Sequence, residues 1–463
     1  MNVLLITLDA FRKDLVSGSH TPYLSKISKE GVTFDNAIST GSGTSSSFPG
    51  ILASSLPMDY GYAKFRPEHV TLAEQLDSTT IGISSSLPTS SIYNFNRGFN
   101  RWNDNVDNSY LGEIRKVIRE NDWLLRLGEK AIKIGEKMFD SDNSPSYTPA
   151  NEVTDTALSE LNKCNKNDNF LWAHYMETHT PYFPPEEFQF GSPSEGIPTV
   201  NKHIDSYNKN KPKVNSPTTP EDTSSIIPKS VRSSMEKYYK SEAKFLDREI
   251  KRLVEGAKRH LEEVTVIICA DHGEEFFEHG HFGHQPKLYE ELVNVPLIVY
   301  STSSDIAEKN IRRPTSLLNI PPTVCDLLDR APADNWRGES LLSILDEGRS
   351  DENPKVISEL CHSADQGLGG PINRDKAIIS VRSDEWKYIL NNQIEKDRLY
   401  NLKKDEKEKE NVVDDHPEIG DKLRRIAEDR LAEITNDSDS ESSNGDISDN
   451  VEDRLEELGY INS

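Results

Sequence analysis

The sequence of 463 residues has few cysteines and no long apolar run. Its cysteines form no C-x-x-C pair and show no spacing typical of a metal site, and they are Cys164, Cys269, Cys325 and Cys361. We therefore expect reduced thiols in a cytoplasmic protein. The apolar N-terminal segment reaches Asp9 too early for a signal peptide, and no later stretch has the length that a bilayer requires. The sequence predicts a soluble protein without a membrane span.

Basic residues are in the minority. Lys and Arg number 54 against 78 Asp and Glu, which gives a formal net charge of -24. This balance argues against nucleic acid or an anionic membrane as the main partner. Because carboxylates keep a protein surface hydrated at high salt, the charge also indicates a halophilic protein from an acidic proteome.

Three apolar runs typical of buried strands each end in acidic or histidine residues. They are Asn2–Leu8 before Asp9, Asn169–Tyr175 before Glu177 and His179, and Val264–Ala270 before Asp271 and His272. In open α/β sheets ligands bind outside the carboxyl ends of the strands. We therefore expect these polar side chains to form one functional edge.

Strands and helices alternate along most of the chain. Further strands are expected over Thr80–Ser84 and Val295–Ser301, and helices over Thr21–Gly31, Phe48–Ser54, Thr71–Asp77 and Ser230–Glu263. This order favours an α/β fold with a largely parallel sheet.

Composition divides the chain into three parts. We expect a catalytic domain over residues 1–350, with a surface insertion at about 188–229 that is rich in Pro, Ser, Thr, Asn and Lys. Short strands and an amphipathic helix predict a small α+β subdomain over residues 351–435. The acidic and serine-rich residues 436–463 are expected to be disordered, with a short terminal helix as one option.

The segment "ADHGEEFFEHGHFGH" is the richest in candidate metal ligands and proton donors. It places His279, His281 and His284 shortly after the strand-end pair Asp271 and His272. A single histidine after a strand is most often structural, but four histidines and an aspartate in one short segment favour a site. Carboxylate oxygen and imidazole nitrogen suit a divalent cation such as Zn, Mn, Mg or Ca. Asp9 by itself would equally well cap a helix, but Asp9 and Asp271 at comparable strand ends could share one cation.

The run "GSGTSSSFPGIL" supplies a candidate nucleophile. A hydroxyl beside a divalent cation loses its proton more readily, and a helix start favours an anionic ester group. Any hydroxyl of the run could attack the ester. We favour Thr44 as the nucleophile and expect Ser45–Ser47 to shape the loop or cap the helix. His179, His279, His281 and His284 could bind a substrate oxygen or protonate the leaving alcohol, and their individual roles stay open.

These segments together resemble the sulfatase branch of the alkaline phosphatase superfamily over about residues 1–434. The matching phrases are "TPYLSKISKEGVTFDNAIST", "HYMETHTPY", "DHGEEFFEHGHFGH", "SVRSDEWKYI" and "LYNLKKDEKEKENVV". The resemblance implies a sulfatase-like three-layer α/β sandwich with a large, mostly parallel central sheet and a small C-terminal α+β subdomain.

The resemblance also implies roles for individual residues. Asp9, Asp271 and His272 would be metal ligands, and Thr44 would be both ligand and nucleophile. His179 and His279 match histidines that contact the sulfate or the leaving group, and His284 stands where many sulfatases have a catalytic lysine.

The nucleophile region departs from the family pattern. Classical sulfatases have Cys or Ser in C-x-P-S-R, which is converted to formylglycine, whereas this chain has T-S-S-S-F from Thr44 to Phe48. No formylglycine is therefore expected. Such a departure is similar to superfamily members that act on phosphate esters or phosphonates.

We expect a metal-dependent hydrolase that acts on a sulfate ester through an unmodified threonine. Its substrate would be a small molecule or a glycan with a sulfate or phosphate ester. One alternative is a phosphoester or phosphonate hydrolase, or a transferase of a phosphorus-linked group. The other is a non-catalytic binding protein on the same fold.

Overall fold

A computed structural model gives the fold over most of the chain. It describes residues 1–60, 69–86, 88–104, 147–210, 222–303, 308–345, 354–361, 373–392 and 397–434. The acidic tail predicted over residues 436–463 lies outside the described residues. No helix in the described part of the chain combines the length and the apolar composition needed to cross a membrane.

The fold is organised around an eight-stranded sheet with the order β12-β2-β11-β7-β1-β6-β4-β5. Its strands are β1 (Asn2–Leu8), β2 (Val32–Phe34), β4 (Thr79–Ile83), β5 (Arg101–Asn103), β6 (Asn169–Tyr175), β7 (Val264–Ala270), β11 (Leu297–Ser301) and β12 (Lys309–Ile311). The run from β7 through β5 is parallel throughout. The mostly parallel sheet predicted from the sequence is confirmed.

Strand register brings the predicted edge together. β1 pairs in parallel with both β6 and β7, and Leu8 aligns with Tyr175 on one side and with Ala270 on the other. All three strands are buried along their whole length, because helices cover both faces of the sheet. Asp9 and Asp271 therefore leave adjacent strands at the same level.

The segment predicted as one strand over Val295–Ser301 is divided by Pro296. Before the proline, β10 (Asn294–Val295) joins β3 (Ala37–Ile38) and β13 (Thr315–Ser316) in a small sheet. After it, β11 runs antiparallel to β7. Proline has no N–H to donate to a sheet ladder, so it separates two strands that pair in different sheets.

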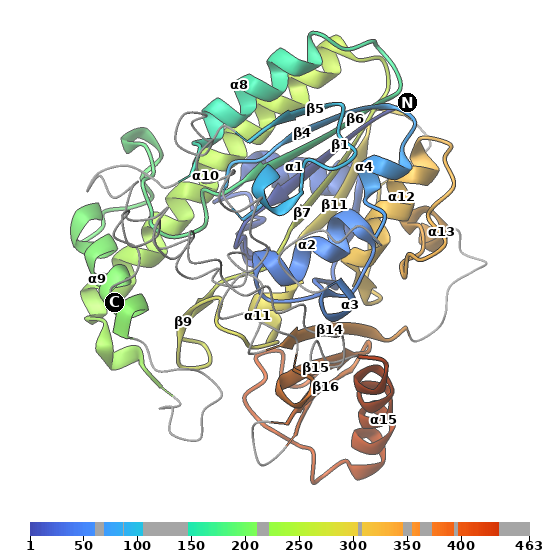
Figure 1. Ribbon diagram of the computed structural model, residues 1–463. Coiled ribbons are helices and arrows are strands. Elements are labelled where there is room, and N and C mark those ends of the chain that lie inside the picture. The colour runs from blue at the N-terminus through green and yellow to red at the C-terminus, as the bar shows by residue number, and fades with distance from the viewer. Residues whose placement is uncertain are drawn as a thin grey trace, which may run out of the picture.

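Helices cover both faces of the large sheet (Figure 1). One face carries α1 (Pro22–Glu30), α8 (Ala150–Leu161) and α10 (Lys229–His260). The other carries α2 (Thr44–Ala53), α4 (Leu72–Gln75), α12 (Ile320–Leu327) and α13 (Leu341–Leu345), while α3 (Pro57–Tyr60) packs against α2 and against the C-terminal subdomain. The main core of apolar side chains lies between these layers, which confirms the three-layer α/β sandwich.

The segment expected as a surface insertion contains a helix that the sequence analysis missed. Helix α9 (Ile197–Asn210) buries Val200, Ile204 and Tyr207 and packs against α10. These positions follow helical spacing, but polar residues around them hide the pattern. The insertion is therefore partly helical.

A small C-terminal subdomain follows the catalytic layers. An antiparallel sheet of β14 (Val356–Cys361), β15 (Ala377–Arg382), β16 (Trp386–Asn391) and β17 (Arg398–Asn401) packs against α15 (Pro417–Glu433). This confirms the predicted α+β character, while the boundary at residue 350 stays a prediction. In Figure 1 the subdomain lies below the large sheet, with its strand β14 on the side of α11 (Glu290–Val293).

A buried ion pair joins α15 to β14. Arg430 Nε lies 2.7 Å from Glu359 Oε2, and its Nη2 lies 3.0 Å from Glu359 Oε1. Both side chains are almost fully buried, and Arg430 also pairs with Asp59 of α3 at 2.8 Å. Arg430 thus connects the subdomain to the catalytic layers.

Replacing Arg430 by methionine should destabilise the protein by about 3–5 kcal/mol, because it leaves the Glu359 carboxylate buried without its cation. Denaturant unfolding followed by circular dichroism would measure this loss. The matched control is Lys26→Met, which removes an exposed pair with Glu30 at 3.7 Å and should cost less than about 1 kcal/mol. Equal losses for both variants would contradict the interpretation.

Candidate active site

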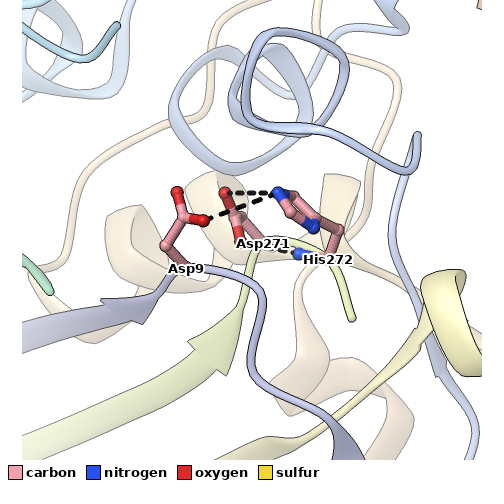
Figure 2. A group of neighbouring side chains, drawn as sticks. All are labelled: Asp9, Asp271 and His272. Carbon is pink, nitrogen blue, oxygen red and sulfur yellow. Dashed lines mark hydrogen bonds and ion pairs between the residues drawn. The ribbon is translucent and has the colours of Figure 1, made fainter. Parts of the chain in front are cut away.

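Three buried side chains converge at the carboxyl ends of β1 and β7 (Figure 2). His272 Nε2 lies 3.7 Å from Asp9 Oδ1 and 3.6 Å from Asp271 Oδ2. One ligand atom from each residue lies within 4.8 Å of the other two. All three residues have no solvent-exposed area. The sequence-predicted trio is thus assembled in one place.

The atoms that face one another in this cluster lack protein partners. Asp9 Oδ1, Asp271 Oδ2 and His272 Nε2 are buried and accept or donate no hydrogen bond within the described structure. Their spacing is too long for direct hydrogen bonds and suits atoms that share one cation. Two carboxylate oxygens and an imidazole nitrogen are also a donor set that divalent cations use. The residues present therefore fit a metal centre.

The pKa shifts of the three side chains also fit a metal centre. Burial raises the pKa of Asp271 well above its ordinary value, and the nearby charge of Asp9 raises it further. Burial alone would raise the pKa of Asp9 too, but His174, His179 and His272 bring it below its ordinary value. Burial, aided by the charge of His284, lowers the pKa of His272 to about 4. His272 is therefore neutral near pH 7, as a metal-binding imidazole must be.

Backbone groups aim the ligand atoms into the cluster. Asp271 Oδ1 accepts hydrogen bonds from the backbone N–H groups of Ala10 at 3.2 Å and His272 at 2.7 Å, which leaves Oδ2 facing the cluster. His272 Nδ1 lies 2.8 Å from the Gly273 carbonyl oxygen. Donation from Nδ1 to that carbonyl leaves the lone pair on Nε2, the usual arrangement for a metal-binding histidine.

Thr44 stands at the edge of this cluster. Its hydroxyl donates to Asp9 Oδ2 at 3.1 Å, and its side chain is only half buried. Thr44 is the first residue of α2, so the helix begins four residues before the predicted Phe48. The hydroxyl therefore lies both beside the ligand Asp9 and at a helix N-terminus, where backbone N–H groups favour an anion.

Two of the neighbouring serines make hydrogen bonds within the loop. Ser46 Oγ lies 3.1 Å from the Gly43 nitrogen and donates to the Gly43 carbonyl at 3.0 Å. Ser47 Oγ donates to the Gly41 carbonyl and accepts from Ser39. Both serines are buried, so the loop presents Thr44 rather than these hydroxyls to the cluster.

His174 is a site residue that the sequence analysis missed. Its Nε2 lies 3.5 Å from Asp9 Oδ2, and its Nδ1 lies 3.0 Å from Thr7 Oγ1. Thr7 Oγ1 also accepts a hydrogen bond from Trp172 at 2.9 Å. The histidine sits inside an apolar strand, which is typical of a core position, and only the pairing of β6 with β1 brings it to Asp9.

His179 and His284 lie next to each other, and His284 lies beside His272. The rings of His284 and His272 are 4.5 Å apart, and those of His284 and His179 are 5.2 Å apart. His284 Nδ1 lies 3.4 Å from Glu274 Oε2, and the His284 side chain keeps 31% of its area exposed. These two histidines combine proximity to the ligands with access to solvent, which proton transfer to a substrate requires.

The other two histidines of the segment have different partners. His279 Nδ1 lies 2.5 Å from Glu291 Oε1, and its Nε2 lies 3.2 Å from the Glu408 carbonyl oxygen. His281 Nδ1 lies 2.9 Å from the Lys287 ammonium. The histidine-rich segment is thus divided, with His272 and His284 at the cluster and His279 beside the C-terminal subdomain.

Comparison with known proteins places this arrangement in a family. A family model described as Sulfatase matches residues 1–330. The chain belongs to the sulfatase family. This confirms the resemblance carried by the sequence motifs and agrees with the fold and with the Asp9, Asp271 and His272 cluster.

Individual relatives of this sulfatase-family chain are distant. It is 30% identical over 181 residues to mouse arylsulfatase K, a match that covers 36% of the chain and 30% of the mouse protein. The chain thus spans less than a third of that relative. The phosphonate monoester hydrolase of Agrobacterium radiobacter has a similar structure, with a TM-score of 0.67, 18% identity and coverage of 94% and 96% of the two chains. A protein solved in complex with its substrate D-glucosamine-2-N,6-O-disulfate has a TM-score of 0.67 at 15% identity, with 93% and 97% covered.

Glu177 is a buried carboxyl group in the segment that follows β6. It follows β6, and its Oε1 accepts a hydrogen bond from the backbone of Ala150 at the start of α8. The next residue, Thr178, donates its hydroxyl to the Asp9 carbonyl. Burial raises the pKa of Glu177 to about 8, and the charge of Glu249 adds to this effect although backbone N–H groups oppose it.

Glu177→Gln should remove a pH dependence of stability. Because its pKa in the folded chain exceeds the ordinary value of 4.5, Glu177 contributes stability that is complete below about pH 4.5 and is lost as the pH rises through 8. The melting temperature of Glu177→Gln minus that of the unmodified protein should therefore become more positive between pH 5 and pH 9. Glu187→Gln, at a side chain with 65% exposure, should show no such trend. Parallel curves for Glu177→Gln and the unmodified protein would contradict the assignment.

Proposed function

We propose that this sulfatase-family protein is a metal-dependent hydrolase of sulfate esters that uses Thr44 as an unmodified nucleophile. The observation that carries the proposal is the Thr44 hydroxyl, which lies 3.1 Å from Asp9 Oδ2 at the edge of the ligand cluster. Threonine cannot be converted to formylglycine, so the hydroxyl itself would attack the ester.

One divalent cation would be held by Asp9, Thr44, Asp271 and His272. The donor set fits Ca, Mn, Zn or Mg. When bound, such a cation lowers the proton affinity of an adjacent hydroxyl and offsets negative charge on the ester oxygens. Asp9 and Asp271 would be ionised in this state, since a cation between them removes their mutual repulsion.

The reaction would proceed in two displacements. First, Thr44 Oγ1 gives up its proton to solvent and bonds to sulfur, while the bond from sulfur to the leaving alcohol oxygen breaks and the alcohol takes up a proton. Water then attacks the threonine ester, the bond between sulfur and Oγ1 breaks, and Thr44 regains a proton as sulfate leaves. Backbone N–H groups at the start of α2 would hold the anionic oxygens in both steps.

The histidines would divide the remaining tasks. His284 is partly exposed and lies beside His272, so it would protonate the leaving alcohol. His179 lies next to His284 and would bind a nonbridging oxygen. His279 was assigned to the same group on resemblance, but its contacts with Glu291 and Glu408 favour a supporting role.

Phosphate or phosphonate esters are the second candidate substrates. The similar fold of a phosphonate monoester hydrolase supports this class, as does the unmodified threonine. The relatives named arylsulfatase and the protein complexed with a disulfated glucosamine support a small-molecule or glycan sulfate ester. Transfer to an acceptor other than water would use the same first displacement. The cytoplasmic location and the halophilic character stay predictions.

Thr44→Ala should abolish turnover of aryl sulfate, phosphate monoester and phosphodiester probes, because no other half-buried hydroxyl of the loop donates to Asp9 among the described residues. The expected loss is at least about 10³-fold for the best probe. Thr44→Ser is the matched control and should keep measurable activity. Turnover by Thr44→Ala at the rate of the unmodified protein would rule out the nucleophile.

Removal of divalent metal should also stop turnover and lower the melting temperature, because a cation that binds only the folded protein stabilises it and because Thr44 loses the charge that lowers its proton affinity. Dialysis against a chelator followed by readdition of each cation would show which one restores both properties. Asp271→Asn should bind the restoring cation at least about tenfold more weakly. A purified protein without divalent metal, unaffected by the chelator and inactive on every probe would favour the non-catalytic alternative.

A further inference from the structure

Two segments of the C-terminal subdomain resemble the sulfatase family but contribute no residue to the reaction described above. They contain Arg382, Lys387 and Glu408, which lie in "SVRSDEWKYI" and "LYNLKKDEKEKENVV". We propose that Lys387 is a positioning residue, which holds α11 and, through α11, the metal-ligand turn Asp271–Gly273. This inference rests on the proposed function, because the turn it holds carries two of the proposed ligands.

Lys387 is a buried cation between two buried carboxylates. Its side chain has no exposed area, and its Nζ lies 3.0 Å from Glu290 Oε1 and 2.9 Å from Glu408 Oε1. Arg382 Nε lies 3.5 Å from the same Glu290 oxygen. Two cations thus balance two carboxylates where β15 and β16 meet the first residue of α11.

Glu408 also binds the backbone of this helix. Its Oε2 accepts a hydrogen bond from the Glu290 N–H at 2.6 Å, and its carbonyl oxygen lies 3.2 Å from His279 Nε2. His279 in turn lies 2.5 Å from Glu291 Oε1. The subdomain is therefore connected both to α11 and to the histidine-rich segment.

Helix α11 is in direct contact with the ligand turn. The Gly273 N–H donates to the Leu292 carbonyl at 2.7 Å. A Cβ at Gly273 would lie only 2.0 Å from the Glu291 carbonyl oxygen, so the two backbones touch without space between them. Because Gly273 follows His272 in the chain, a displacement of α11 is transmitted to the ligand His272.

Loss of the Lys387 cation would upset this arrangement. Glu290 and Glu408 would face each other without the cation between them, while Arg382 stays beside Glu290, and like charges repel strongly away from water. Relief of that repulsion would move Glu290, and with it α11. The turn Asp271–Gly273 would then no longer hold its ligand atoms at the observed spacing.

The test compares Lys387→Met with Lys403→Met in the full chain. Lys403 forms an exposed pair with Asp384 at 2.8 Å in the same subdomain and is the matched control. Titration calorimetry would measure the affinity for Mn²⁺, and hydrogen exchange would follow peptides that cover residues 271–293. We expect Lys387→Met to bind Mn²⁺ at least about tenfold more weakly and to exchange faster in these peptides, with Lys403→Met unchanged.

A charge-balancing variant separates positioning from a loss of packing. Lys387→Met/Glu408→Gln removes one carboxylate charge together with the cation, so it should regain most of the Mn²⁺ affinity. If Lys387→Met does not fold, Glu408→Gln is measured in its place and should weaken Mn²⁺ binding about threefold. It does so because it leaves two cations against one carboxylate.

Wild-type Mn²⁺ affinity and unchanged exchange in Lys387→Met, with only a lower melting temperature, would overturn the inference. Absence of Mn²⁺ binding by the unmodified protein would instead count against the proposed function. Hydrogen exchange at residues 271–293 would still decide the positioning role in that case, so the two failures are distinguishable.

Discussion

The site depends on the parallel pairing of β1 with β7, which forces two buried carboxylates to lie side by side. Leu8 and Ala270 are register partners, so Asp9 and Asp271 leave the sheet together. Neither has solvent access, and their facing oxygens have no partner in the described structure. Such a pair is unfavourable unless a proton or a cation lies between the two charges. The pairing of β1 with β7 therefore favours the binding of positive charge between Asp9 and Asp271, at the proposed active site.

The groups around the two carboxylates are arranged to bind a cation and an anionic substrate. Burial keeps His272 neutral, so it offers a lone pair rather than a charge. Helix α2 directs its N-terminus at the same place and brings Thr44 within hydrogen-bond distance of Asp9. Two cationic side chains of the neighbouring segments are paired with other carboxylates, since Lys287 pairs with Glu275 and Arg12 pairs with Glu278. The proposed nucleophile thus meets the ligand cluster at an edge that an anionic ester can approach.

The C-terminal subdomain belongs to the same electrostatic arrangement. Lys387 and Arg382 neutralise Glu290 and Glu408 at the start of α11, and α11 contacts the turn that follows β7. Arg430 pairs with Glu359 inside the subdomain and with Asp59 of α3 in the catalytic layers. Buried charge pairs therefore connect the subdomain to the catalytic layers at α11 and at α3, and the inference that Lys387 positions the ligand turn rests on the first of these connections.

The sequence by itself determined the bounds of the strands β1, β6 and β7. In an α/β fold, a continuous apolar run of about this length that ends in polar residues predicts a buried strand. It also identified Asp9, Asp271 and His272 as neighbours, since strand ends in a parallel sheet share an edge. Only the tertiary structure showed where each histidine lies. His174 looks like a core residue until β6 pairs with β1, and the contacts of His279 with Glu291 and Glu408 appear only in the folded chain, while its proposed role stays a prediction. Spacing along the chain carries no information on which side a turn presents each ring, and packing against other segments fixes that side.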